Sequence, residues 1–219
     1  MNQSIFNDFL AFLNNPTKAE TYTQMPSKSF LTLLFLTLAL VIPFSFLLSF
    51  LGVDQFESVL DEILKKNKWL LVLLGVFLAP LMEEPIFRLH LNLKKSSIWW
   101  SLVLSVLVIN EQWYLGVAFM IYLIYLLISV SQNEPPNLKF VVYASAIFFG
   151  IVHLGNYSNF DIASQFYWIP FLVGAQFFIG LILSYIRLTH GIWYSIIFHG
   201  VYNAVLIIPA VYFYDPTVI

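Results

Sequence analysis

Two adjacent glutamates and an arginine stand in a run of apolar residues that begins at Trp69. The stretch 80–88 reads Pro-Leu-Met-Glu-Glu-Pro-Ile-Phe-Arg, with carboxylates at Glu83 and Glu84 and a guanidinium at Arg88. A charge at the centre of a bilayer costs about 2.5–3.5 kcal/mol on insertion scales, so intramembrane charges mark functional sites by default. A carboxylate held there could act as a general base.

The two glutamates have different expected partners. Glu84 and Arg88 are four residues apart with the acid first, which is the favoured order for an ion pair on one helix face. Glu83 lies about 100° further around the helix and has no helical partner. Pro85 cannot donate to the carbonyl of Leu81, so we expect the helix to bend or open there. Buried ions must be paired in any fold, which also allows a purely structural role for Glu84.

Two further polar pairs have the same spacing of four. Phe149 precedes His153, and an aromatic ring one turn away could pack against the imidazole. His199 precedes Asn203, and two donors on one helix face can point at one oxygen atom, as an oxyanion stabiliser must. Each pair alone would also suit a plain interhelical hydrogen bond. If all three sets converge, a general base and an oxyanion hole share one water-accessible cavity.

Composition determines the elements that must position these residues. The chain has 219 residues, of which 60% are hydrophobic and only 10% charged, against about 25% charged in soluble domains. Its apolar runs are continuous and not alternating, so we predict an all-α, polytopic transmembrane helix bundle of about seven spans, with six to eight allowed. The net charge of −2 gives no reason to expect a nucleic-acid partner. The absence of cysteine excludes disulfides, thiolate catalysis and cysteine-ligated metal.

The apolar runs also predict the domain organisation. We expect a cytoplasmic or interfacial segment at 1–28, with a short helix and a loop, and a single transmembrane domain at 29–214. An amphipathic surface helix is expected at 54–68. Basic loop residues favour a cytoplasmic N-terminus. The expected spans are 29–51, 69–93, 114–130, 138–154, 166–186 and 192–214, together with a short apolar run at 98–109.

Taken in order on separate spans, Glu83-Glu84-x-x-x-Arg88, Phe149-x-x-x-His153 and His199-x-x-x-Asn203 resemble the three motifs of the CPBP family. This family holds the type II CAAX-processing endopeptidases and their bacterial relatives, formerly called Abi proteins. The resemblance covers about residues 69–207. It departs from many members by having two apolar runs, 98–109 and 114–130, between the first and second motifs.

The resemblance implies an intramembrane endopeptidase with assigned residue roles. Glu83 would be the general base that activates water, and His153 would help to position that water. His199 and Asn203 would stabilise the oxyanion. Glu84 would assist or pair with Arg88, and Arg88 would be largely structural, as would Phe149. The chain carries no HExxH, GxSx or GxGD pattern, and Ser184 and Ser195 lie in unremarkable apolar contexts, so water should be the nucleophile.

The cofactor and the partners follow from the same resemblance. The family is often labelled metalloprotease, and Glu83, His153 and His199 would be the ligands if zinc is present. Water activated by glutamate and histidine without a metal is equally consistent, and we favour it slightly. We expect a peptide or membrane-protein substrate within the lipid bilayer of a bacterial plasma membrane. A bacterial relative without prenylation would act on small peptides, pheromone or bacteriocin precursors, or membrane proteins.

Two other functions would use the same buried charges. A non-catalytic membrane scaffold or bacteriocin-immunity type protein would keep the polar network only for structure. A transporter or proton relay would use the carboxylates to carry protons, although no internal repeat supports this. The discriminating observation is whether Glu83, His153, His199 and Asn203 converge around one cavity.

Overall fold

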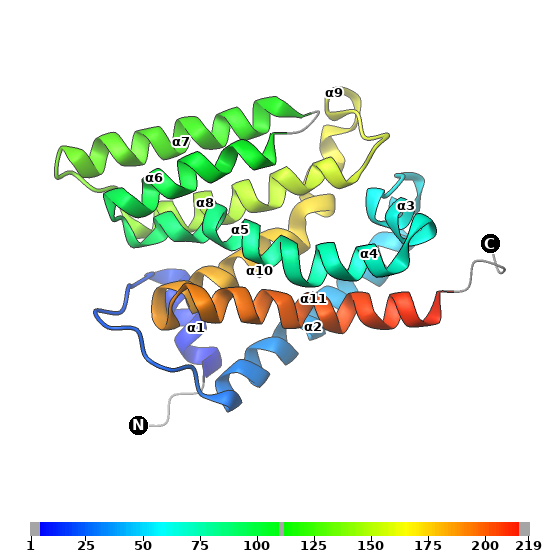
Figure 1. The fold of residues 1–219 in the computed structure, drawn as a ribbon, viewed down its shortest axis with the longest axis horizontal. Helices are drawn as coiled ribbons and strands as arrows, with labels where there is room; N and C mark the ends of the chain where they lie inside the picture. The colour runs from blue at the N-terminus through cyan, green and yellow to red at the C-terminus, as the bar shows by residue number, and fades with distance from the viewer. Residues whose placement is uncertain (1–4, 110–111, 215–219) are drawn as a thin grey trace.

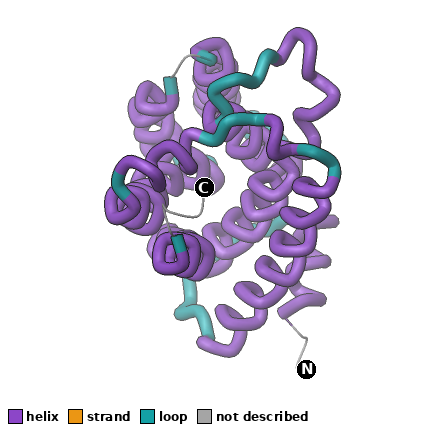
Figure 2. Tube along the Cα trace, turned by 90° about the vertical axis from the view of Figure 1, so that its right-hand side faces the viewer, coloured by secondary structure: helices purple, strands orange, loops and turns teal. Residues whose placement is uncertain are grey.

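The computed structural model describes residues 5–109 and 112–214. Within these ranges the chain forms helices joined by loops, with no β-strand (Figure 2). A single antiparallel bridge joins Ser58 to Tyr157. Helices satisfy every backbone polar group within one segment, which long apolar runs require in hydrocarbon. The prediction of an all-α fold is therefore confirmed.

Six helical stretches are long and apolar enough to cross a membrane, and a shorter apolar stretch covers Lys95–Val108. The predicted number of about seven spans, with six to eight allowed, is confirmed, and the chain is an integral membrane protein. The six stretches are Ser27–Phe50, Lys68–Asn92, Trp113–Ser131, Leu138–Asn156, Ile162–His190 and Ile192–Phe213.

Several of these stretches change helix type along their length. In chain order the described elements are α1 (Ile5–Asn14), α2 (Ser27–Phe50), η1 (Val53–Gln55), α3 (Val59–Lys66), α4 (Lys68–Val72), the π-helix η2 (Leu73–Leu78), α5 (Ala79–Arg88), η3 (Leu89–Asn92), α6 (Lys95–Leu104), η4 (Ser105–Val108), α7 (Trp113–Ser131), α8 (Leu138–Val152), η5 (His153–Asn156), α9 (Ile162–Gln165), η6 (Phe166–Trp168), α10 (Ile169–His190) and α11 (Ile192–Phe213). All η elements except η2 are 3₁₀ helices.

Helix α5 occupies the middle of the bundle (Figure 1). Helices α6 and α7 lie on one flank, α2 and α11 lie on the other, and α5 itself contacts α6, α8, α10 and α11. The apolar core adjoins α5, where the buried ring of Phe87 packs against Phe119 and Phe149 at centroid distances of 4.9 and 5.4 Å. The fold therefore places Glu83 and Glu84 between the helices that carry the two histidines.

Helix α8 approaches α10 closely because Gly150 has no side chain. A Cβ atom at Gly150 would lie 3.2 Å from the carbonyl oxygen of Val173 and 3.4 Å from the backbone nitrogen of Phe177. Both atoms belong to the backbone of α10, which cannot move without moving the helix. The glycine thus permits the close contact between the two helices.

We expect Gly150→Ala to lower stability by about 1–3 kcal/mol, because the new methyl group presses on backbone atoms. Gly174→Ala on α10 is the matched control, since its Cβ would meet only the ring of Phe44, 3.2 Å away, and that ring can rotate. Thermal melting of the two purified variants in the same detergent checks this. A Gly150→Ala protein that melts at or above the wild-type temperature would contradict it.

The helix was expected to bend or open at Pro85, and it does not open there. Helix α5 runs without interruption from Ala79 to Arg88, and the irregular turns lie on either side of it, in the π-helix η2 and the 3₁₀ helix η3. The π-helix ends at Leu78, shortly before Pro80, because Pro80 has no N–H to continue the hydrogen-bond pattern. Pro80 is thus accommodated by a change of helix type before it, while Pro85 lies within α5.

The N-terminal segment contains the short helix that was predicted, but this helix packs on the bundle. In α1, Phe9 and Phe12 are buried, and both rings contact Tyr185 of α10 edge-on at 5.7 and 5.3 Å. The apolar spacing of α1 suits lipid and protein equally, so the cytoplasmic or interfacial position of this segment stays a prediction. The amphipathic helix expected at 54–68 is shorter than predicted, since α3 begins after its N-cap, Ser58, and ends at Lys66.

Candidate functional site

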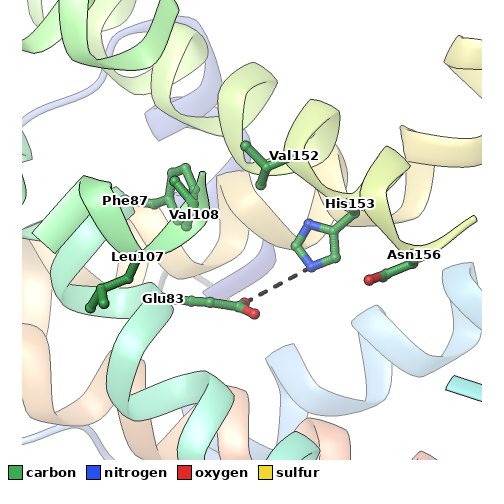
Figure 3. Close-up of a pocket in the computed structure, with 7 residues that line it drawn as sticks. All are labelled: Glu83, Phe87, Leu107, Val108, Val152, His153 and Asn156. Atoms are coloured by element: carbon green, nitrogen blue, oxygen red, sulfur yellow. Dashed lines mark ion pairs between the residues drawn. The ribbon is translucent and has the colours of Figure 1, made fainter. Parts of the chain in front are cut away.

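Three spans bring Glu83, His153 and His199 together. The Oε2 atom of Glu83 on α5 lies 3.9 Å from Nε2 of His153, the first residue of η5, and 3.8 Å from Nε2 of His199 on α11. Figure 3 shows the carboxylate of Glu83 facing the imidazole of His153. These separations exceed a direct hydrogen bond. They suit one water molecule shared between the groups.

The other ring nitrogen of each histidine, Nδ1, lies within hydrogen-bond distance of an acceptor. Nδ1 of His153 lies 2.6 Å from the carbonyl oxygen of Phe149, and Nδ1 of His199 lies 2.9 Å from Oε1 of Glu84. A carbonyl and an ionised carboxylate only accept, so these partners assign the proton to Nδ1 in each ring. In the neutral rings, two Nε2 lone pairs then face the Glu83 carboxylate. These three acceptors cannot bond to one another and need a hydrogen-bond donor between them. A water molecule can donate two hydrogen bonds to them.

Glu84 connects the site to the fold. Its side chain is fully buried, and Oε2 lies 3.8 Å from Nε of Arg88, which is the ion pair expected from the spacing. The same oxygen accepts a hydrogen bond from the hydroxyl of Ser195, while Oε1 accepts from His199. Glu84 therefore both pairs with Arg88 and orients His199.

Sequence reasoning missed Ser195, because its neighbours are apolar. The available signal was its position four residues before His199, on the same face of α11. Its hydroxyl also lies 3.3 Å from the carbonyl oxygen of Leu183. Ser195 thus helps to hold the Glu84 carboxylate in place.

The ring of Phe149 packs against the guanidinium of Arg88 and against both imidazoles of the site. The guanidinium carbon of Arg88 lies 3.8 Å from the centroid of Phe149, and the imidazoles of His153 and His199 lie 4.7 and 5.9 Å away. The nitrogens of Arg88 make no hydrogen bond with any described residue. Its charge is balanced by Glu84 and by the aromatic face. Arg88 and Phe149 accordingly support the site without entering it.

The side chain of Asn203 is hydrogen-bonded to the backbone of another helix, away from Glu83 and the histidines. Its Nδ2 atom donates to the carbonyl oxygen of Gly75, 2.7 Å away. In the π-helix η2 the backbone N–H of Ala79 bonds to Leu74, and the next residue, Pro80, has no N–H, so the Gly75 carbonyl has no backbone donor. Asn203 supplies the missing donor. Its role as an oxyanion stabiliser stays a prediction, because the contact accounts for one of its two amide hydrogens.

A cavity of about 150 Å³ opens beside Glu83. Its polar wall carries Glu83, His153 and a residue not foreseen from the sequence, Asn156, and its other wall is apolar (Figure 3). The short apolar stretch Lys95–Val108 ends at this cavity, where η4 contributes two side chains. The apolar lining residues are Phe87, Leu107, Val108 and Val152.

The predicted metal ligands have suitable donor atoms but not the spacing of a zinc site. Zinc at about 2.0–2.1 Å from each ligand holds tetrahedral donor atoms roughly 3.3–3.4 Å apart. The two Nε2 atoms lie 3.9 and 3.8 Å from Oε2 of Glu83. In residues 5–109 and 112–214, no three His, Asp or Glu side chains are arranged to hold a metal ion. The chemistry proposed below therefore uses the protein side chains alone.

Comparison with protein families gives a match. A family model described as type II CAAX prenyl endopeptidase Rce1-like matches residues 65–205, which is more than half of the chain. The matched region contains Glu83, His153, His199 and the residues that orient them. No curated protein and no solved structure matches the chain significantly.

Proposed function

The chain belongs to the type II CAAX prenyl endopeptidase Rce1-like family, and on this premise we propose that it hydrolyses a peptide bond within the membrane by means of water activated by Glu83. One observation carries the proposal. The Glu83 carboxylate faces two imidazole nitrogens at 3.9 and 3.8 Å beside a cavity, which is an arrangement that holds a water molecule next to a base. The side chain of Glu83 is 24% exposed, so it can meet both water and substrate.

The first step forms the bond between water and the substrate. Glu83 accepts a proton from the water as the oxygen attacks the carbonyl carbon of the scissile peptide. The C=O electron pair moves to the carbonyl oxygen and gives a tetrahedral oxyanion. Glu83 then returns the proton to the amide nitrogen, the C–N bond breaks, and the products are a carboxylic acid and an amine. No side chain becomes covalently attached.

The two histidines have different roles because their Nδ1 partners differ. His153 donates to the neutral carbonyl of Phe149 and presents a lone pair that fixes the water. His199 has the carboxylate of Glu84 at Nδ1, so the ring can take up a second proton from solvent at Nε2, and that carboxylate balances the resulting positive charge. We therefore assign oxyanion stabilisation to His199, with Asn203 as the second predicted donor.

The test is cleavage by the purified protein in detergent or liposomes. The probes are internally quenched peptides, one set with a farnesylated CAAX end and one set of the same sequences without the lipid. Mass spectrometry identifies the new carboxyl end, and H₂¹⁸O labels it with one heavy oxygen. The proposal is wrong if neither set is cleaved by protein that is folded and monodisperse. The difference between the sets shows whether the substrate must be prenylated.

Removal of metal ions is expected to leave cleavage unchanged, because the proposed steps use only Glu83, His153 and His199. The rate after treatment with EDTA or 1,10-phenanthroline should stay within about twofold of the untreated rate. Metal content by mass spectrometry, measured on the same sample, serves as the control. Loss of activity that zinc restores would overturn the metal-free mechanism and favour these three residues as ligands.

A further inference from the structure

The cavity contains one amide that the three motifs do not explain. Asn156 is the last residue of the 3₁₀ helix η5, which starts at His153. A 3₁₀ helix has three residues per turn and rises about 2.0 Å per residue, so side chains at i and i+3 lie on the same face. The change from α8 to η5 at His153 therefore directs His153 and Asn156 to the same side, and both line the cavity.

The side chain of Asn156 has no hydrogen-bond partner among the described residues. It makes no hydrogen bond to any other described residue, although it is only partly exposed to solvent. Its neighbours in the loop are firmly held: the backbone N–H of Ser158 donates to the carbonyl of Glu57, and Asn159 bonds to Gln55 and Glu57. A fixed loop thus presents a free amide to the cavity. Figure 3 shows the side chain of Asn156 beside the imidazole of His153, with Glu83 across from that imidazole.

Asn156 differs in this respect from Asn203. The amide of Asn203 replaces the donor that Pro80 cannot supply to the Gly75 carbonyl, and Asn203 is not part of the cavity lining. Among the described residues that line the cavity, Glu83 is an acceptor, His153 points its lone pair inwards, and four others are apolar. Only Asn156 brings a neutral side-chain donor to the space where a peptide carbonyl would lie.

We propose that the amide of Asn156 is a catalytic residue that donates a hydrogen bond to the carbonyl oxygen of the scissile peptide as negative charge develops there. This inference rests on the proposed peptidase function and adds a donor to it. In this arrangement Glu83 and His153 deliver the water to the carbonyl carbon, and Asn156, one 3₁₀ turn after His153 on the same face of η5, donates to the carbonyl oxygen. A preorganised neutral donor at this point stabilises the oxyanion without adding charge to the membrane interior.

The test compares Asn156→Ala and Asn156→Asp with the wild-type protein on the quenched peptide that is cleaved fastest. Loss of one oxyanion donor lowers kcat by about 10²–10³-fold with little change in KM. Asn156→Asp keeps the size of the side chain but replaces the donor by an acceptor, so it should be at least as slow. Asn159→Ala is the matched control, because it loosens the same loop without touching the cavity. Melting temperatures show whether each variant is folded.

The outcomes separate this inference from the function on which it rests. Wild-type protein that cleaves no probe overturns both. Active wild-type protein together with Asn156→Ala at more than a third of the wild-type kcat overturns the inference alone. An equal loss in Asn156→Ala and Asn159→Ala also overturns it, because the loop and not the amide would then matter.

Asn203→Ala is expected to lower the melting temperature, since it leaves the Gly75 carbonyl without a donor.

Discussion

Glu83→Gln is expected to lower the rate of peptide cleavage by at least about 10³-fold while the protein stays folded. The amide keeps the shape of the side chain but cannot accept a proton from water, and general-base catalysis contributes about 10²–10⁴-fold. Glu83 is partly exposed, and its nearest partners are two imidazoles 3.9 and 3.8 Å away, which is beyond direct hydrogen-bond distance. Neutralising it should therefore change the melting temperature little. The measurement is kcat on the best quenched peptide together with thermal melting in detergent.

Glu62→Gln provides the control for this variant. Glu62 lies on α3, half exposed, and pairs with Lys66 at 3.7 Å, so its loss should leave kcat unchanged. A Glu83→Gln protein as active as the wild type would remove the basis of the enzyme proposal and favour a structural scaffold. Proton uptake into liposomes that depends on Glu83, in the absence of peptide cleavage, would favour the proton relay instead.

The convergence of Glu83 with His153 and His199 could be predicted because the spans contain few other polar groups. A charged side chain in hydrocarbon must find a polar partner, and the remaining candidates came from distant spans. The ion pair of Glu84 with Arg88 followed from helix geometry alone. The number and the limits of the apolar helices followed from composition and length. These features depend on patterns that hold along a single segment.

Other features could not be predicted because they depend on local changes of helix type. In the 3₁₀ geometry of η5 the side chains of His153 and Asn156 are aligned along one face, while in an α-helix the same spacing would offset them by about 60°. The contact of Asn203 with Gly75 needs the π-helix before Pro80. The residue types do not predict either change of helix type. Irregular turns of this kind are frequent at functional sites, and here two of them contact or adjoin the proposed catalytic residues.

Glu84→Gln is expected to reduce both stability and catalysis, because Glu84 performs two tasks. Its carboxylate is the only anion within ion-pair distance of the buried guanidinium of Arg88 among the described residues. Removing one partner of a buried pair costs about 3–5 kcal/mol. The variant also takes the negative charge away from Nδ1 of His199. Thermal melting measures the first effect, and kcat on the folded fraction measures the second.

The double variant Glu84→Gln/Arg88→Met separates the two tasks. Replacing both members of a buried ion pair by uncharged residues is often neutral for stability, so the melting temperature should recover most of the loss seen in Glu84→Gln. Catalysis should not recover, because His199 still lacks its carboxylate. If kcat returned together with the melting temperature, Glu84 would act only through Arg88. The Glu84 carboxylate would then act only in stability, and the second proton on His199 would not depend on its negative charge.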